Sequence, residues 1–264
     1  MGAQMLAAAL PRFLRRNEAL IEYRESGLMR HCRLAPHVYA CFAGNAVIFL
    51  DTKTSLYFAL GGAQARVLRA CAASESSVAD ESVARDVASD QLLREVTQLL
   101  QQRHLLASDV STGKAIVPTS IPSAQSVLLR EHLAGRPPVR LHHIINFLWA
   151  CGRAAFSLRA CSLDQTLRRL RARQRGGVHV DVDRSRALLR VFFRLRPFVF
   201  SAHKACLFDS LALTEFMARY DIHATWAIGV RTNPFKAHCW VQQATYVLND
   251  NVENVRLFTP IVAA

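Results

Sequence analysis

The sequence lacks the patterns that mark most metal, nucleotide and membrane sites. Its ten histidines and seven cysteines form no HExxH motif and no cluster with metal-ligand spacing, so we expect no bound metal. It has no glycine-rich phosphate loop, so any ATP dependence would come through a partner. No run reaches the ~18 uninterrupted apolar residues of a membrane helix, which argues against membrane insertion.

Cysteine pairs of the CxxC type are also absent, and the number of cysteines is odd. Reduced thiols in a cytoplasmic protein are the simplest explanation. Positive charge, in contrast, is in excess, with a formal net charge of +13. Such charge attracts nucleic acid, anionic membranes or acidic peptides. Because no zinc spacing or RNA-binding aromatic pattern accompanies it, we expect no nucleic-acid binding.

The residues with the clearest chemistry lie between positions 204 and 260. Cys206 begins an apolar-periodic segment, ACLFDSLALTEFMARY, which predicts a helix with the thiol in its first turn. Unpaired backbone N–H groups and the helix dipole favour the thiolate there, and the thiolate is the nucleophilic form. The same N–H groups could hold an oxyanion.

Two β-rich segments follow, HATWAIGV and KAHCWVQQ, separated by the turn sequence RTNPF, and YVLND is expected to form a third strand. His238 and Asp250 would then lie on adjacent antiparallel strands. A three-residue loop would set them directly opposite, roughly 5 Å apart at Cβ, whereas a two-residue loop would make them diagonal neighbours. In either case the carboxylate could orient the imidazole as the base for a thiol nucleophile.

Each of these residues also has a structural interpretation. A cysteine at the start of a buried helix is most often a small apolar residue, and a strand histidine is most often part of a core. Cys239 is a rival nucleophile, but strand alternation sends its side chain to the face opposite His238, so we expect it to pack in the core.

The segments KACLFDSLALTEFMARYDIHA and WAIGVRTNPFKAHCWVQQATYVLNDNVEN resemble the transglutaminase-like leader peptidases of lasso-peptide biosynthesis, the lasso B proteins. The motif GVRTxPFxxHxWV, followed by a loop and LND, carries this resemblance, which covers residues 140–264 well and the N-terminal part more loosely. It implies that Cys206 is the nucleophile, His238 the base and Asp250 its orienting partner. Cys239 departs from the small residue expected at that position.

The resemblance implies a cysteine protease that binds the leader of a lasso precursor peptide and cleaves it off through a thioester. The freed core amine would pass to a partner, an ATP-dependent cyclase resembling asparagine synthetase. Three alternatives remain. An acyltransferase would use the same triad, a non-catalytic carrier would only present the precursor to the cyclase, and a DNA-binding winged helix would account for charge and the small domain.

The N-terminal region predicts a second domain. Short apolar segments separated by turn sequences at 44–45 and 52–54 indicate three strands, at 37–42, 46–51 and 55–60. Helical patterns follow at 62–72, 77–88 and 90–104, the last with Asp90 as its N-cap and a stripe of Leu92, Leu93, Val96, Leu99 and Leu100. This set resembles the small winged-helix-like domain that recognises leader peptides. A leader would add a strand at an exposed edge, and the candidates are Leu56, Tyr57 and Phe58.

The expected fold class is therefore α+β, with the small recognition domain joined to a transglutaminase- or papain-like domain whose catalytic helix packs on an antiparallel sheet. The expected boundaries are an extension or misassigned start at 1–28, the recognition domain at 29–108, a Ser/Pro-rich linker at 109–138 with a short helix at 124–133, and the peptidase domain at 139–264. In the last domain we expect one helical stripe to pack on the core, made of Leu141, Ile144, Ile145, Leu148 and Trp149.

Overall fold

The computed structural model describes residues 33–76, 87–109, 111–128, 138–173, 181–200 and 206–264. The chain divides into two compact units, one of residues 1–36 and 70–115 and the other of residues 37–69 and 116–264. The strands expected in the recognition domain thus fall in the same unit as the C-terminal half. The functional boundaries at 29–108 and 139–264 stay a prediction, and the extension at 1–28 lies outside the described residues.

The predicted N-terminal strands are confirmed as an antiparallel meander of β1 (Val38–Ala43), β2 (Ala46–Asp51) and β3 (Leu56–Gly61). In the central strand β2 every residue between its two ends is buried, which is why its sequence reads as a continuous apolar run. Gly44 turns the chain between β1 and β2 at φ +56°, a conformation that glycine adopts without strain. β3 forms one edge of this three-stranded sheet.

Helix α2 (Gly62–Ser76) follows β3, and the boundary between the two units falls within it, after residue 69. Helix α3 (Val87–Gln102) belongs to the unit of residues 1–36 and 70–115. The stripe predicted for α3 is confirmed, with Leu93, Val96 and Leu100 buried. Asp90 lies inside the first turn of α3, so its prediction as N-cap is wrong. Almost all of the helix predicted at 77–88 lies outside the described residues.

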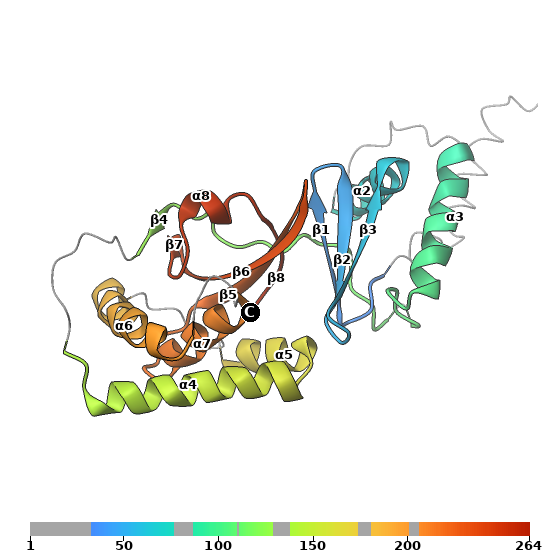
Figure 1. Cartoon of the computed structure of the whole chain (residues 1–264). Helices are drawn as coiled ribbons and strands as arrows, with labels where there is room; N and C mark the ends of the chain where they lie inside the picture. Colours follow the sequence, from blue (N-terminus) through green and yellow to red (C-terminus); the bar gives the residue numbers. More distant parts are fainter. Residues whose placement is uncertain (1–32, 77–86, 110, 129–137, 174–180, 201–205) are drawn as a thin grey trace, which may run out of the picture. The chain divides into compact units, whose positions relative to one another are not determined.

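The second sheet has five strands in the order β4-β7-β6-β5-β8, and only β4 and β7 run parallel (Figure 1). The strands are β4 (Ser126–Val127), β5 (Thr225–Thr232), β6 (Phe235–Gln243), β7 (Tyr246–Val247) and β8 (Thr259–Ala263). One face packs against helix α7 (Cys206–Ala218), and the short helix α8 (Val252–Val255) contributes to the core on the other face. The strand predicted at 246–250 ends at Val247.

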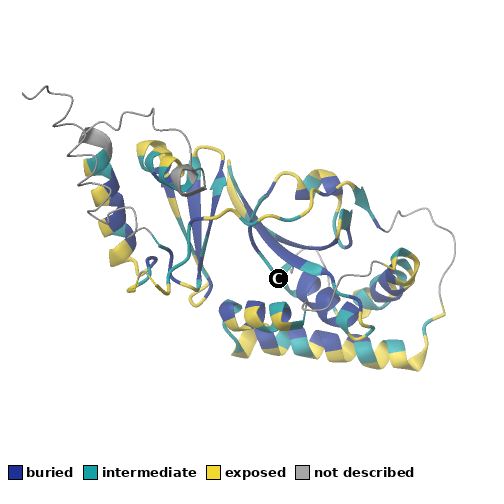
Figure 2. Cartoon of the chain, turned by 180° about the vertical axis from the view of Figure 1, so that it is seen from behind, coloured by how far each residue is buried: buried dark blue, intermediate teal, exposed yellow. Residues whose placement is uncertain are grey.

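Helix α7 is the centre of this unit, because it lies between the sheet and helix α4 (Leu141–Ala160) (Figure 1). Every residue from Asp209 to Met217 is buried, as Figure 2 shows in blue. A helix that is buried on all sides is expected to be apolar on all sides, and α7 is apolar apart from a few polar residues with internal partners.

The stripe predicted to bury α4 is wrong, because it faces solvent. Leu141, Ile145 and Leu148 are 72%, 58% and 54% exposed. The buried face instead consists of Phe147, Ala150, Cys151, Ala154 and Ser157. Since α4 has apolar residues on both faces, periodicity alone does not select the packed one, and the small residues of the buried face let α7 approach closely.

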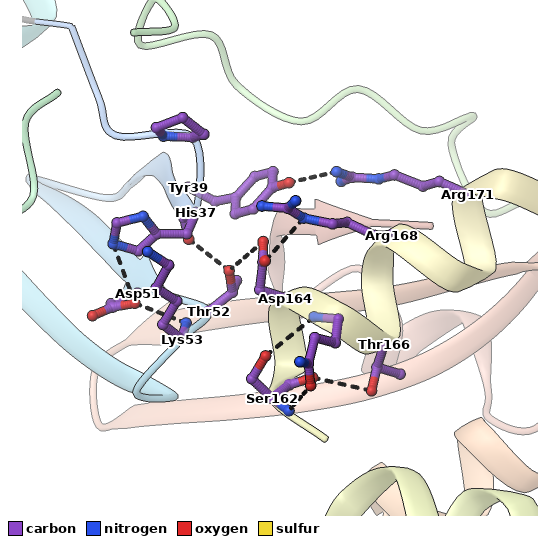
Figure 3. Close-up of polar contacts among 12 residues, drawn as sticks. His37, Tyr39, Asp51, Thr52, Lys53, Ser162, Asp164, Thr166, Arg168 and Arg171 are labelled. Carbon is purple, nitrogen blue, oxygen red and sulfur yellow. Dashed lines mark hydrogen bonds and ion pairs between the residues drawn. The ribbon is translucent and has the colours of Figure 1, made fainter. Parts of the chain in front are cut away.

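Helix α5 (Leu163–Arg173) connects the two sheets of the unit (Figure 3). The Asp164 N–H donates to the Thr52 carbonyl at 2.9 Å, and Arg168 pairs with the Asp164 carboxylate at 2.9 Å. Arg171 bonds the Tyr39 hydroxyl and donates to the Ala263 carbonyl at 2.8 Å. Helix α6 (Val182–Leu195) completes the helical layer.

Residues 116–128, within the expected linker, pack on the second sheet. Thr119 donates to the Ile261 carbonyl at 2.7 Å, and Arg256 donates to the Ala124 carbonyl at 2.8 Å. Residues 124–128 contain β4, so the helix predicted at 124–133 is wrong over its described part. Strand pairing with β7 outweighs the weak helical pattern. None of the helices in the described ranges has the length and apolar character to cross a membrane.

Candidate active site

Cys206 is the first residue of α7, where the sequence predicted it. The helix is held in place by polar contacts just beyond the cysteine. Ser210 donates to the Cys206 carbonyl at 2.7 Å and accepts from the Trp226 indole N–H at 2.8 Å. Further along, the buried Glu215 pairs with Arg169 and Arg173 at 2.6 and 2.7 Å. These contacts place the thiol against the sheet.

His238 and Asp250 meet through a hydrogen bond between His238 Nε2 and Asp250 Oδ2. Gln243 pairs with Tyr246, so the loop between β6 and β7 has two residues, and the three-residue register that would set the pair directly opposite is wrong. The two-residue alternative applies, with Asp250 reaching back from a bend after β7. Because Nε2 is bonded to the carboxylate, Nδ1 is the nitrogen left for the thiol.

Neighbouring asparagines hold the Asp250 carboxylate. Asn254 Nδ2 donates to Oδ2 at 2.8 Å, and the Asn251 N–H donates to Oδ1 at 2.7 Å. Asn249 anchors the same bend, since its Oδ1 accepts from the Val241 N–H at 2.8 Å and its Nδ2 donates to Asp209 on α7 at 3.0 Å. The bend is thereby tied to both the strand that carries His238 and the helix that carries Cys206.

The electrostatics of the site favour a charged pair. Hydrogen bonds from the Cys239 thiol and from His238 outweigh burial and lower the pKa of Cys206 to about 4. Burial alone would lower the pKa of His238, but hydrogen bonds to Asp250 and Cys206 raise it to about 9. Burial likewise opposes ionisation of Asp250, yet hydrogen bonds from His238, Asn251 and Asn254 keep its pKa below the usual value. A thiolate and an imidazolium therefore coexist at neutral pH.

Aromatic packing fixes the plane of the imidazole. The His238 ring stacks on Trp240 with ring centroids 6.3 Å apart and lies 5.0 Å from Phe258. Gly229, directly across from His238 on β5, leaves the space for this packing, because a Cβ there would lie 2.8 Å from the Trp240 ring. Steric exclusion of any larger side chain therefore explains the glycine of the GVRT motif.

A cavity of about 300 Å³ opens beside Cys206. Its wall is mostly apolar and comes from α4, α5, β2, β3, β5, β6 and the start of α7; it includes Leu50, Tyr57, Leu163, Thr166, Cys206 and Cys239. Since Cys206 is half-exposed and lines this cavity, a substrate group in it could reach the sulfur.

The residues predicted to bind a leader lie on the edge strand β3. Leu56 is 68% exposed. Tyr57 lines the cavity beside Cys206 and meets the Phe235 ring at 5.5 Å, whereas Phe58 packs against Phe49 at 6.2 Å. Alternation therefore points Tyr57 and Phe58 to different surroundings, and leader binding by these residues stays a prediction.

The sequence did not predict the contacts that Asn254 and Cys239 make with the site residues. Asn254 carries no signal beyond its place in VEN, and its contact with Asp250 depends on α8. Cys239 packs in the core as predicted, but its contact with Cys206 was not foreseen. Among the described residues, no group of three or more His, Cys, Asp or Glu side chains could hold a metal ion.

The comparison with family models agrees with this geometry. Residues 144–263 match the transglutaminase-like superfamily, so the part of the chain that holds the site is a transglutaminase-like domain. That superfamily includes cysteine peptidases and acyltransferases, and the match does not single out the lasso B proteins among its members. Searches of the curated proteins and of the solved structures found no match.

Proposed function

We propose that this protein is a cysteine peptidase that removes the leader from a lasso-peptide precursor. The observation that carries the proposal is the linked arrangement of Cys206, His238 and Asp250, with Cys206 in the wall of a mostly apolar cavity. The specific assignment to lasso precursors rests on the sequence motif GVRTxPFxxHxWV with its LND segment.

The geometry supports the following steps. The Cys206 thiolate attacks the carbonyl carbon of the leader–core amide, while backbone N–H groups in the first turn of α7 can stabilise the oxyanion. The His238 imidazolium gives its proton to the leaving amine, and Asp250 keeps the ring oriented. Water, activated by the neutral imidazole, then hydrolyses the thioester and releases the leader.

The freed core amine would be the substrate of a separate ATP-dependent cyclase, which is the proposed partner. ATP dependence would enter only through that partner. The proposed leader-binding edge is β3, where Tyr57 is both on the strand and in the cavity wall, so a leader paired with β3 would end close to the sulfur.

Acyl transfer to an amine is the second candidate, because the same triad forms the same thioester. Only the acceptor of the acyl group differs, and exclusion of water from the site would favour the amine. A carrier without catalysis would keep precursor binding but would not need the thiol.

Mass spectrometry of the neighbouring precursor peptide, incubated with this protein, the cyclase and ATP, tests the proposal. Wild-type protein should give one cut at the leader–core junction, and Cys206→Ala should give none while still binding the leader. A leader–amine adduct in place of the free acid would establish acyl transfer. An intact, bound peptide with both proteins would establish the carrier.

A further inference from the structure

Two thiols lie side by side at the proposed active site. Cys206 begins α7 and Cys239 lies on β6, two elements that pack against each other, and each thiol is the largest influence on the pKa of the other. Both line the same cavity, and both are free cysteines. They differ in exposure, because Cys206 is partly exposed whereas Cys239 is 6% exposed and belongs to the core cluster.

The proposed peptidase reaction does not use Cys239. Hydrolysis needs one nucleophile, one base and its orienting partner, and a small apolar residue at position 239 would pack the same space. A second sulfur in contact with the first adds a chemistry that the triad alone lacks, since two adjacent thiols can be oxidised to a disulfide.

We propose that Cys206 and Cys239 form a reversible disulfide when the protein meets a hydroperoxide, which makes the pair an oxidative modification site that blocks the nucleophile. The Cys206 thiolate attacks one peroxide oxygen, the O–O bond breaks, and the sulfur becomes a sulfenic acid, while the other peroxide oxygen leaves as hydroxide and takes up a proton to become the first water. Cys239 then loses its proton and attacks that sulfur. The S–S bond forms, the S–O bond breaks, and the hydroxide leaves with the proton as water. Two thiols lose two electrons in total, and hydrogen peroxide is reduced to two waters.

The environment of each sulfur suits its step. Peroxide reacts with thiolates, and the pKa of about 4 keeps Cys206 ionised at neutral pH. The hydrogen bond to the Cys206 thiolate, followed by burial, raises the pKa of Cys239 well above the ordinary value. Once Cys206 is a neutral sulfenic acid, the thiolate that holds the proton on Cys239 is gone, so Cys239 becomes the better nucleophile when it is needed.

The disulfide would protect Cys206. A low-pKa, accessible thiolate without a neighbouring thiol proceeds to sulfinic and sulfonic acids, which dithiol reductants do not reverse. A disulfide stops the oxidation at a state that such reductants restore. The inference is independent of the substrate, so its failure would leave the peptidase proposal intact, and failure of the peptidase proposal would not affect it.

The test is peptide mapping of the full-length protein after hydrogen peroxide treatment, with the remaining thiols blocked by iodoacetamide. The expected result is a cross-linked peptide pair joining Cys206 and Cys239, with two of the seven cysteines protected from alkylation and released by dithiothreitol. In Cys239→Ala, the same dose should drive Cys206 to sulfinic acid, and dithiothreitol should not restore its alkylation.

Cys161→Ser is the matched control, because Cys161 is the other thiol in the cavity wall. The Cys206–Cys239 cross-link should form unchanged in this variant. A cross-link from Cys206 to Cys161, or irreversible oxidation of Cys206 at equal rates in wild type and Cys239→Ala, would overturn the proposal. Cys239→Ser repeats the comparison with a side chain close in size to cysteine.

Discussion

At the scale of single residues, the chemistry of the site depends on the protonation states of Cys206 and His238. Cys206 gives up its proton because the Cys239 thiol and His238 stabilise its thiolate, and His238 keeps a proton because Asp250 and the thiolate stabilise the imidazolium. Cys239 stays protonated because it is buried and donates to the thiolate. The reactive form of the site is therefore one defined protonation state.

This state predicts a pH profile. The lowered pKa of Cys206 means that the thiolate forms as pH rises through about 4, and the raised pKa of His238 means that the imidazolium is lost as pH rises through about 9. Peptidase activity should therefore be highest between these two values. The rate of Cys206 alkylation by iodoacetamide should rise with a midpoint near 4, as measured by mass spectrometry across pH.

The matched variant for this profile is His238→Ala. Loss of its hydrogen bond should move the alkylation midpoint upward, toward the ordinary cysteine value of about 8.5. A wild-type midpoint that already lies near that ordinary value would refute the thiolate–imidazolium pair.

At the scale of elements, α4 shows how packing selects among apolar faces. Its buried residues contact α7, and Phe147 meets the Phe192 ring at 5.4 Å and the Phe216 ring at 6.3 Å. The stripe on its other side, which includes Leu148, remains exposed. Adjacent positions on one helix therefore have opposite environments.

Substitutions at two adjacent positions of α4 should differ in cost. Phe147→Ala should lower the free energy of unfolding by about 3–5 kcal/mol, because it leaves a cavity among aromatic rings. Leu148→Ala should change it by no more than about 0.5 kcal/mol, since its side chain is already half in water. Urea denaturation of the full chain measures both, and similar losses would contradict the observed face.

At the scale of the whole molecule, several arginines have a structural role. Several arginines of the larger unit bridge its elements through carboxylates or backbone carbonyls; these include Arg69, Arg169, Arg171, Arg173, Arg196 and Arg256. Arg69, Arg171 and Arg256 donate to neutral backbone carbonyls, so they contribute to the net charge of +13 while bridging elements of the fold. Positive charge of this kind gives no reason to expect nucleic acid.

The three-stranded sheet shares its hydrophobic core with the elements that carry the candidate active site. Ile48 and Leu50 of β2 are 1% and 0% exposed and belong to the cluster that contains α7 and β6. A fragment of residues 139–264 should therefore lose cooperative unfolding, since burial of each such side chain contributes about 1.5–3 kcal/mol. Thermal melts and Cys206 alkylation rates of fragment and full chain measure this. Matching melts and rates would show that the sheet is dispensable.

The sequence by itself determined the local features of the site. The 3.6-residue period predicts the helix that begins at Cys206. β-Branched and aromatic residues predict the strand that carries His238, and apolar segments bounded by turn sequences predict the three strands between residues 38 and 61. These features follow from the short-range rules of helices and strands. The order of Cys206, His238 and Asp250 was enough to suggest thiol chemistry before any contact was known.

Only the tertiary structure decided features that depend on distant partners. The two-residue loop that brings Asp250 to His238 depends on one step of strand register, which the sequence left open. Which face of α4 is buried depends on the side chains of α7 that it packs against. The contact of Cys206 with Cys239 depends on how α7 packs against β6. Such contacts arise from packing between segments far apart in the chain, and local periodicity carries no information about them.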